Sequence, residues 1–157
     1  MDDMTTEDRR SGPDRLDGGI VLRQLGRGGE ERGLFHLLGH LRPGFTNEQL
    51  DELLSVGYDQ GLRYLVAQAG RATVGAAGYR VLATSRGRIL VVDDLVTSPA
   101  VRSRGIAPVL LDELRRRAVA AGCCRIELDS GVGNTGAHRF YLRNRLDISA
   151  FHFACEV

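Results

Sequence analysis

Residues 89–114 constrain this chain more than any other segment. An apolar run, two adjacent aspartates, a turn with glycine and an amphipathic stretch follow one another there. The apolar run predicts a strand and the leucine spacing predicts a helix, joined by the turn. Such a turn directs backbone N–H groups and the positive end of the helix dipole towards one point. The pattern Arg102-x-x-Gly105-x-Ala107 therefore predicts an anion site that fits a pyrophosphate.

Two other glycine-rich stretches carry related patterns. Arg23-Gln-Leu-Gly26-Arg-Gly28 repeats the first pattern, and Gly131-Val-Gly133-Asn-Thr-Gly136 matches the G-x-G-x-x-G pattern of dinucleotide-binding folds. A dinucleotide-binding unit also needs an acidic residue about 20 positions later, at the end of a second parallel strand. The sequence stops at Val157 before such a strand, so a nicotinamide-dependent oxidoreductase is the least favoured hypothesis.

Length and charge limit the broad class of protein. A chain of 157 residues predicts one domain. Residues 1–18 are polar without an apolar period, so we expect a mobile N-terminal segment followed by a folded domain over residues 19–157. The net charge of +1 offers no field for nucleic acid or a membrane surface. No apolar run approaches the roughly 18 residues of a membrane span, and the N-terminus does not resemble a signal peptide, so a cytoplasmic protein is expected.

Residue types exclude several kinds of chemistry. All 21 basic residues are arginine, so a Schiff base, a P-loop lysine and a lysine general base are excluded. The three cysteines form neither a CxxC pair nor the spacing of a zinc site. His36 and His40 lie one helical turn apart but lack a third ligand, so no metal site is expected.

Hydrophobic periodicity predicts an α/β domain whose strands are mostly antiparallel. Strands are expected over residues 19–25, 63–69, 73–84, 88–97, 125–129 and 148–157, and helices over residues 29–41, 46–61, 106–121 and 134–145. The short turns at residues 70–72 and 85–87 predict hairpins. A helix separates the strands at 88–97 and 125–129, so these two strands should form a parallel pair through a crossover.

This order of elements and two linked motifs resemble the GNAT superfamily of acetyl-CoA-dependent N-acetyltransferases. In that family a strand ends in Leu-x-Val-x-Pro and is followed by Arg/Gln-x-x-Gly-x-Gly/Ala at a helix start. The chain reads Leu95-Val-Thr97-Ser-Pro99-Ala-Val-Arg102-Ser-Arg-Gly105-Ile-Ala107, in which only Thr97 departs. Pro108 also removes one possible phosphate donor, although proline is tolerated in the first turn of a helix.

The second family motif consists of a strand, an asparagine near the next helix and Ala-x-x-Phe-Tyr. It appears as Glu127-Leu-Asp-Ser, Asn134 and Ala137-His-Arg-Phe140-Tyr141, while Arg145-Leu146 replaces a common Gly-Phe pair. The resemblance implies a GNAT-type mixed sheet, mostly antiparallel with one parallel strand pair at the cofactor cleft. About four helices should flank this sheet.

The resemblance implies acetyl-CoA as the cosubstrate. Backbone groups of Leu95, Val96 and Thr97 should pair with the pantetheine arm as though it were an added strand. The pyrophosphate should be held by the turn at the helix start, which comprises Arg102, Ser103, Arg104, Gly105, Ile106 and Ala107. Asn134 should contact the pantetheine arm or cap the last helix, and the sequence favours neither role over the other.

The resemblance also suggests the acid and base. Asp93 lies where many family members carry a residue that removes the amine proton through water, and Asp94 is the second candidate. Strand alternation places the two on opposite faces, unless a bulge, which the family shows in this strand, turns one into the cleft. The family tyrosine points at the thioester sulfur, so Tyr141 is the predicted general acid. Solvated carboxylates and a core tyrosine are the structural alternatives.

The resulting hypothesis is direct transfer of an acetyl group to a primary amine of a small molecule or peptide N-terminus. A non-catalytic acyl-CoA-binding regulatory module of the same fold is the alternative. Residues 37–58 should line the acceptor side. The acidic residues Glu48, Asp51, Glu52 and Asp59 either attract a cationic amine or form a solvated helix face. No nucleic-acid or membrane partner is expected, and a homodimer is left open.

Overall fold

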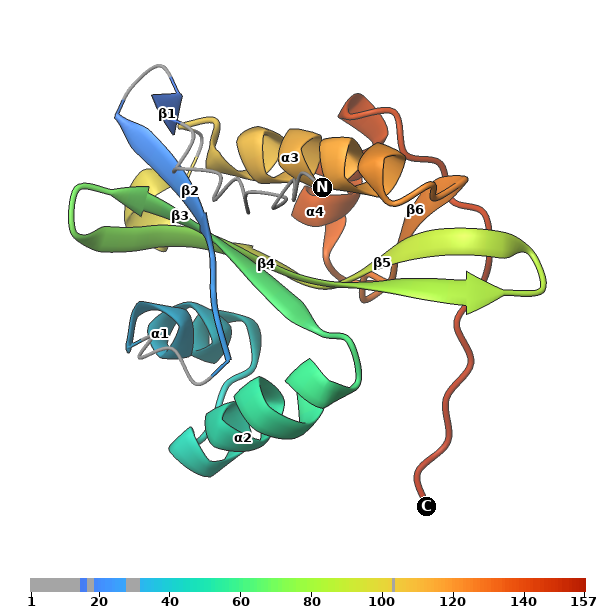
Figure 1. Cartoon of the computed structure of the whole chain (residues 1–157), viewed down its shortest axis with the longest axis horizontal. Helices are drawn as coiled ribbons and strands as arrows, with labels where there is room; N and C mark the ends of the chain where they lie inside the picture. The colour runs from blue at the N-terminus through green and yellow to red at the C-terminus, as the bar shows by residue number, and fades with distance from the viewer. Residues whose placement is uncertain (1–14, 17–18, 28–31, 103) are drawn as a thin grey trace, which may run out of the picture.

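The computed structural model describes residues 15–16, 19–27, 32–102 and 104–157 (Figure 1). Within them, six strands form one sheet in the order β1 to β6: Arg15–Leu16, Ile20–Gln24, Arg63–Ala69, Ala72–Thr84, Gly87–Thr97 and Arg125–Leu128. The helices α1 to α4 are Arg32–Leu41, Asn47–Glu52, Ile106–Ala120 and Thr135–Arg143. A π-helical turn, Leu53–Gly57, continues α2.

The sheet pairing agrees with the hairpins and the crossover expected from the sequence. Strands β1 to β5 pair antiparallel with their neighbours. Strand β6 pairs parallel with β5, from Ile89 opposite Arg125 to Val92 opposite Leu128. The predicted fold class, a mostly antiparallel mixed sheet with one parallel pair and four helices, is therefore confirmed.

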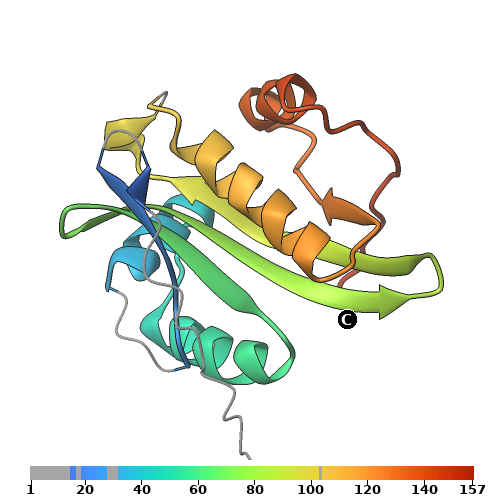
Figure 2. The same cartoon turned by 45° about the horizontal axis from the view of Figure 1, so that its top comes forward.

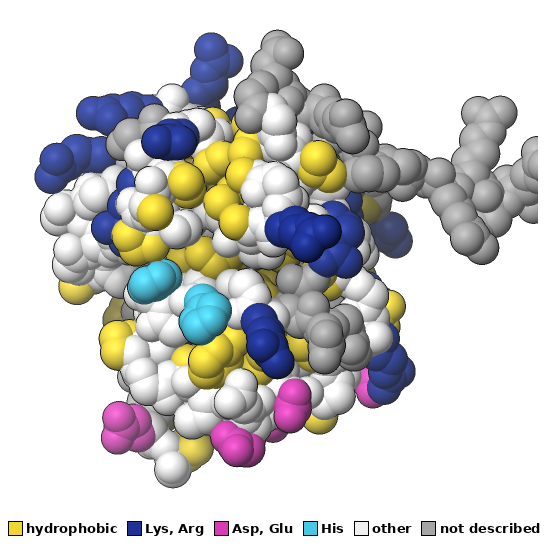
Figure 3. All heavy atoms as spheres, turned by 90° about the vertical axis from the view of Figure 1, so that its left-hand side faces the viewer, with side chains coloured by type: hydrophobic (Ala, Val, Ile, Leu, Met, Phe, Trp, Pro, Cys, Tyr) yellow, Lys and Arg dark blue, Asp and Glu magenta, His cyan; other side chains and the backbone are white. Residues whose placement is uncertain are grey.

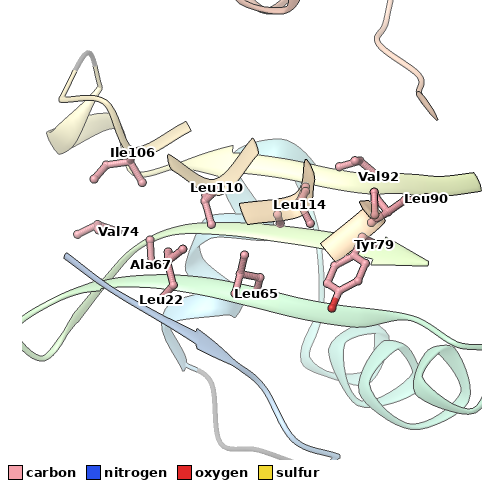
Figure 4. Close-up of a cluster of buried hydrophobic side chains, with 12 residues drawn as sticks. Leu22, Leu65, Ala67, Val74, Tyr79, Leu90, Val92, Ile106, Leu110 and Leu114 are labelled. Carbon is pink, nitrogen blue, oxygen red and sulfur yellow. The ribbon is translucent and has the colours of Figure 1, made fainter. Parts of the chain in front are cut away.

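Helices cover both faces of the sheet. Helix α3 lies on one face, whereas α1 and α2 lie on the other (Figure 2). Leu65, Leu110 and Leu114 belong to the cluster beneath α3 (Figure 4), and Leu34, Leu38 and Val66 belong to the cluster beneath α1. Because both faces are covered, residues 64–67 of β3 are all buried, rather than alternating between core and solvent.

Two glycines of β4 allow close packing on opposite faces of the sheet. A Cβ atom on Gly75 would lie 2.7 Å from Cγ2 of Ile106, at the start of α3. A Cβ atom on Gly78 would lie 2.8 Å from Cε1 of Tyr64, whose ring crosses the β4 backbone. Real Cβ atoms do not approach other atoms so closely, so side chains at these positions would displace α3 or Tyr64.

The second helix begins at the residue that the sequence predicts. Thr46 Oγ1 accepts a hydrogen bond from Gln49 N at 3.2 Å, and Gln49 Oε1 accepts one from Thr46 N at 2.9 Å. This reciprocal pair is a capping box, which satisfies two N–H groups that the helix itself leaves unpaired. The helical segment ends before Gly61, which has a φ of +89°.

The expected last strand is wrong. Residues 144–157 form no helix or strand, and the side chains of Phe151 and Phe153 are 86 % and 89 % exposed. Their alternating apolar pattern predicts a strand, but the pattern alone does not show whether the segment pairs with the open edge of β6.

Two residues of the expected N-terminal segment lie among the described residues. Arg15 and Leu16, which fall within the segment expected to be mobile, pair with Val21 and Ile20. Residues 1–14 and 17–18 of that segment lie outside the described residues. None of the described helices has the length and apolar character needed to cross a membrane.

Candidate active site

A β-bulge in β5 determines where the two adjacent aspartates point. Gly78 pairs with Asp94 and Tyr79 pairs with Val92, so Asp93 is the additional residue between two paired positions. A bulge interrupts the alternation of side chains between the two faces of a sheet. Both carboxylates consequently line one pocket of about 260 Å³, together with Leu38, Arg42, Phe45, Leu53, Leu62 and Arg80.

The carboxylate of Asp94 makes one short and one long contact. Tyr64 donates its hydroxyl hydrogen to Asp94 Oδ2 at 2.6 Å, and Arg42 Nη2 lies 3.4 Å from Asp94 Oδ1. Burial and the negative charge of Asp94 raise the pKa of Tyr64, so its hydroxyl remains a proton donor. The Asp94 side chain is thus fixed in position, with 12 % of it exposed.

Asp93 is better suited than Asp94 to accept a proton. Its side chain is 30 % exposed, and Arg80 Nε donates to Oδ2 at 3.0 Å. Burial raises the pKa of Asp93, and Asp94 adds to this increase, while Arg80 opposes it. Oδ1 makes no hydrogen bond with any described residue. A carboxylate with a raised pKa and a free oxygen meets the requirements of a general base.

The ion pair with Arg80 predicts a change in pH dependence. Arg80→Gln removes a hydrogen bond and a positive charge that lower the pKa of Asp93, so this pKa should rise further. Since the base works only when deprotonated, the acidic limb of the kcat/KM profile should move to higher pH in the variant. Arg71→Gln, an exposed arginine in the turn between β3 and β4, is the matched control. An unchanged or lower limb for Arg80→Gln would show that Asp93 is not the titrating base.

Tyr141 lies on α4, apart from the two aspartates. It is half-buried, it is not among the residues that line the aspartate pocket, and its hydroxyl makes no hydrogen bond within the described part of the chain. Burial raises the pKa of Tyr141, which keeps the phenol protonated at neutral pH. The structure therefore does not bring the predicted acid and base into contact, and a bound substrate would have to lie between them.

The edge of β5 opens beside the aspartates. Parallel pairing with β6 ends at Val92 and Leu128, while β5 continues to Thr97 and pairs only with β4. Alternate N–H and C=O groups of this last part of β5 face away from β4, and no described strand pairs with them. Leu95, Val96 and Thr97 thus present the open edge that the added-strand hypothesis requires.

The predicted anion site follows directly at the start of α3. Gly105 has a φ of +79° and precedes Ile106, the first helical residue. A Cβ atom on Gly105 would meet nothing within 4 Å, so the space before the turn is open. The first turn of α3 contains no acidic residue, and Arg102 and Arg104 are exposed beside it. The N–H groups of Ile106 and Ala107 complete this cationic turn, whereas Ser103 lies outside the described residues.

Asn134 caps the last helix. Its Oδ1 accepts a hydrogen bond from Ala137 N at 3.3 Å. The capping role is therefore present, and contact with a pantetheine arm remains a prediction. The same region disfavours the oxidoreductase hypothesis, since no strand follows α4 in the described chain to complete a second nucleotide-binding crossover.

Sequence reasoning missed Tyr64 and Arg80, which bind the two aspartates, and the contact of Arg42 with Asp94. Arg42 itself lies within residues 37–58, which were expected to line the acceptor side and which contribute half of the pocket lining. Tyr64 and Asp94 are 30 residues apart, and Arg42 and Asp94 are 52 apart, so no local motif connects them. For Tyr64 the signal is the pairing of β3, β4 and β5, which aligns Tyr64 with Gly78 and Gly78 with Asp94, whereas Arg42 follows α1 and belongs to no strand. This register was readable only once the bulge at Asp93 was known.

Comparison with known proteins defines the class. Residues 34–145 match the model of the acetyltransferase (GNAT) family, and the chain belongs to this family. A comparison with curated protein sequences gives no match.

Solved structures share the fold at low sequence identity. An aminoglycoside acetyltransferase from an uncultured soil metagenomic sample, in complex with trehalose, has a TM-score of 0.76 at 17 % identity, covering 90 % of this chain and 98 % of that one. The aminoglycoside N-acetyltransferase AAC(6')-Iy, in complex with CoA, has a TM-score of 0.74 at 16 % identity, covering 94 % and 97 %. An acetyltransferase from Trypanosoma brucei has a TM-score of 0.73 at 21 % identity, covering 88 % and 99 %.

Proposed function

We propose that the protein transfers the acetyl group of acetyl-CoA directly to a primary amine in the cytoplasm. The observation that carries this proposal is the arrangement along β5: the cationic turn at Gly105, the open edge at residues 95–97 and the bulged Asp93 follow one another on a single path. This order fits a cofactor whose pyrophosphate lies at the turn, whose pantetheine arm pairs along the edge and whose thioester meets the amine near Asp93. The three cysteines are free thiols, as is usual in the cytoplasm.

The residues of the site divide the reaction between them. Acetyl-CoA supplies a thioester, whose C–S bond breaks as the amine nitrogen forms a bond to the carbonyl carbon. The turn from Arg102 to Ala107 holds the pyrophosphate, and the edge at residues 95–97 orients the pantetheine arm. Asp93 takes the amine proton, directly or through one water, and Tyr141 gives a proton to the departing thiolate. Asp94, fixed by Tyr64, keeps the bulge and the Asp93 carboxylate in position.

Binding of acetyl-CoA or CoA should raise the melting temperature of the protein, because both ligands bind only the folded state. In Gly105→Val this increase should disappear, since a side chain in the open space before the turn blocks close approach of the pyrophosphate to the backbone. Thermal unfolding with and without ligand measures the effect.

Gly122→Val is the matched control, because Gly122 lies just beyond the other end of α3 with a φ of +67° and open space around its Cβ position. Both variants should lose stability without ligand, as expected for a branched side chain at positive φ. Only Gly105→Val should lose the ligand-dependent increase. If acetyl-CoA raised the melting temperature of Gly105→Val as much as that of the wild type, the turn would not be the phosphate site.

Turnover is tested by release of free CoA from acetyl-CoA across a panel of amines. Release that depends on an amine supports the transferase. The regulatory alternative of the same fold predicts ligand-dependent stabilisation without release of thiol by any amine.

We also propose that the protein forms a homodimer through residues 144–157. Phe151 and Phe153 are exposed, and β6 pairs only with β5 among the described strands, so an apolar segment and an open sheet edge exist on the same chain. A second copy offers both features in the complementary position. The wild-type chain should sediment as a dimer, and a Phe151→Ser/Phe153→Ser double variant as a monomer. A monomeric wild type at roughly 50 µM, well above the micromolar dissociation constants of weak complexes, would contradict the proposal.

A further inference from the structure

The charges within the aspartate pocket cancel. Arg80 pairs with Asp93 and Arg42 lies beside Asp94, so two cationic and two anionic side chains give a formal sum of zero. A pocket that binds a polycation needs an excess of negative charge, since an unpaired ammonium loses its hydration without compensation. A single amine fits at Asp93, whose Oδ1 is free although Arg80 binds Oδ2, whereas both oxygens of Asp94 already have partners.

The remaining wall of the pocket is apolar and the pocket is small. Leu38, Phe45, Leu53 and Leu62 line it together with the charged groups. Its volume of about 260 Å³ lies below the ~300 Å³ at which pockets for drug-sized ligands begin. These dimensions fit an acceptor with a compact apolar body rather than one built from several sugar rings.

Arg42 provides a site for an anionic group of the acceptor. Its side chain is 60 % exposed, and its single contact with Asp94 is long, at 3.4 Å. Asp94 does not depend on this contact, because the buried Tyr64 holds its other oxygen at 2.6 Å. The other guanidinium donors of Arg42 can therefore pair with a carboxylate, for which the planar guanidinium fork is the best partner among side chains.

The acidic residues that were expected to attract a cation lie elsewhere. Glu48, Asp51 and Glu52 are exposed on α2 and do not line the pocket, and Asp59 pairs with Arg27 at 2.8 Å. A backbone hydrogen bond and a bond with Thr46 lower the pKa of Glu48, as expected for a carboxylate at a helix start. Figure 3 shows acidic side chains along the lower edge of the face that it draws, apart from most of the arginine side chains.

We infer that the acceptor is a small primary monoamine that carries both an apolar body and a carboxylate, in the manner of an apolar amino acid. Its amine would face Asp93, its apolar body the leucines and Phe45, and its carboxylate Arg42. This inference rests on the proposed acetyl transfer and narrows its substrate class. Aminoglycosides, which the names of some structural neighbours include, and polyamines carry several amines and do not fit this charge balance.

The test compares matched acceptors with the full-length protein at saturating acetyl-CoA. Phenylalanine, leucine and methionine are measured against phenethylamine and isopentylamine, which lack the carboxylate, and against spermidine and kanamycin, which carry several amines. Values of kcat/KM from CoA release should be highest for at least one of the amino acids. The decarboxylated amines should fall roughly tenfold or more below it, as expected for loss of a charge-assisted hydrogen bond, and the polycations further still.

Arg42→Gln identifies the residue responsible. This variant should lose about tenfold or more in kcat/KM for the preferred amino acid and change little for its decarboxylated amine. Arg32→Gln removes the same charge from the other end of α1 and should change neither value. Preference for a polycation, preference for a decarboxylated amine, or an equal loss on both substrates in Arg42→Gln would each overturn the inference.

Failure of the proposed reaction is distinguishable from failure of this inference. If no amine releases CoA although CoA still raises the melting temperature, acetyl transfer is wrong. Calorimetry of the same three amino acids against CoA-loaded protein then tests the pocket alone. Binding by the wild type that Arg42→Gln abolishes would support the assigned ligand class, and absence of binding to the wild type would overturn it.

Discussion

Replacing Tyr141 with phenylalanine should lower kcat by roughly 10² or more and change the affinity for acetyl-CoA by less than about threefold. The substitution keeps the ring and removes only the hydroxyl, which makes no hydrogen bond with the described residues and so supports no local structure. Loss of the hydroxyl should therefore slow only the step in which the thiolate departs. Steady-state kinetics at saturating substrates and calorimetric titration with acetyl-CoA measure the two quantities separately.

Tyr58→Phe is the control for this substitution, because Tyr58 packs its ring against Arg63 and its hydroxyl also makes no hydrogen bond with a described residue. Normal turnover in Tyr141→Phe would remove Tyr141 as the acid. Loss of affinity and thermal stability together would indicate a packing role. Because burial raises the pKa of Tyr141, wild-type kcat should also show no loss from phenol ionisation up to about pH 10, the ordinary tyrosine value.

Asp93→Asn should lower turnover by roughly 10² to 10³, the usual contribution of a positioned general base. The loss should be largest above the acidic limb, where Asp93 of the wild type is deprotonated but most of the amine is still protonated, and should shrink as rising pH supplies neutral amine. Rates measured across the pH range with one acceptor give the profile.

Asp94→Asn provides the comparison for Asp93→Asn. Asp94 is held by Tyr64, so its replacement should cost less turnover. Because Asp94 raises the pKa of Asp93, the acidic limb should move to lower pH in this variant, and above that limb the loss should not vary with pH. A loss in Asp93→Asn that is equal at every pH would assign Asp93 a structural role. A loss in Asp94→Asn that is larger than in Asp93→Asn and that shrinks as pH rises would identify Asp94 as the base and Asp93 as the positioning residue.

Local patterns were sufficient for most of the fold. Alternating apolar residues and short turns predict β3, β4 and β5 to within one residue of their observed ends, and Thr46 predicts the start of α2. The strand expected at residues 148–157 was wrong, since apolar alternation does not report whether a segment pairs, even where β6 has no second partner among the described strands. Local patterns therefore identify elements more reliably than they identify partners.

The candidate site was predictable only where its residues are neighbours in sequence. Asp93, Asp94 and the turn at Gly105 belong to one continuous segment, so a motif reveals them. Tyr64, Arg42 and Arg80 reach the aspartates through strand register and helix packing. The bulge that brings these two sets of residues together comes from a single additional residue in β5, Asp93. The alternation of apolar residues does not by itself predict this bulge.

The contact between Gly78 and Tyr64 has a consequence for how relatives of this protein can diverge. Any side chain at position 78 would enter the space of the Tyr64 ring, whose hydroxyl holds Asp94. A substitution at residue 78 alone would therefore be selected against. Loss of the Tyr64 ring beside an unchanged Gly78 would also be selected against, because it would leave a void. Positions 64 and 78 should consequently covary across the family branch that shares Asp94, and a change at one should mark lineages in which the acceptor pocket has been rebuilt.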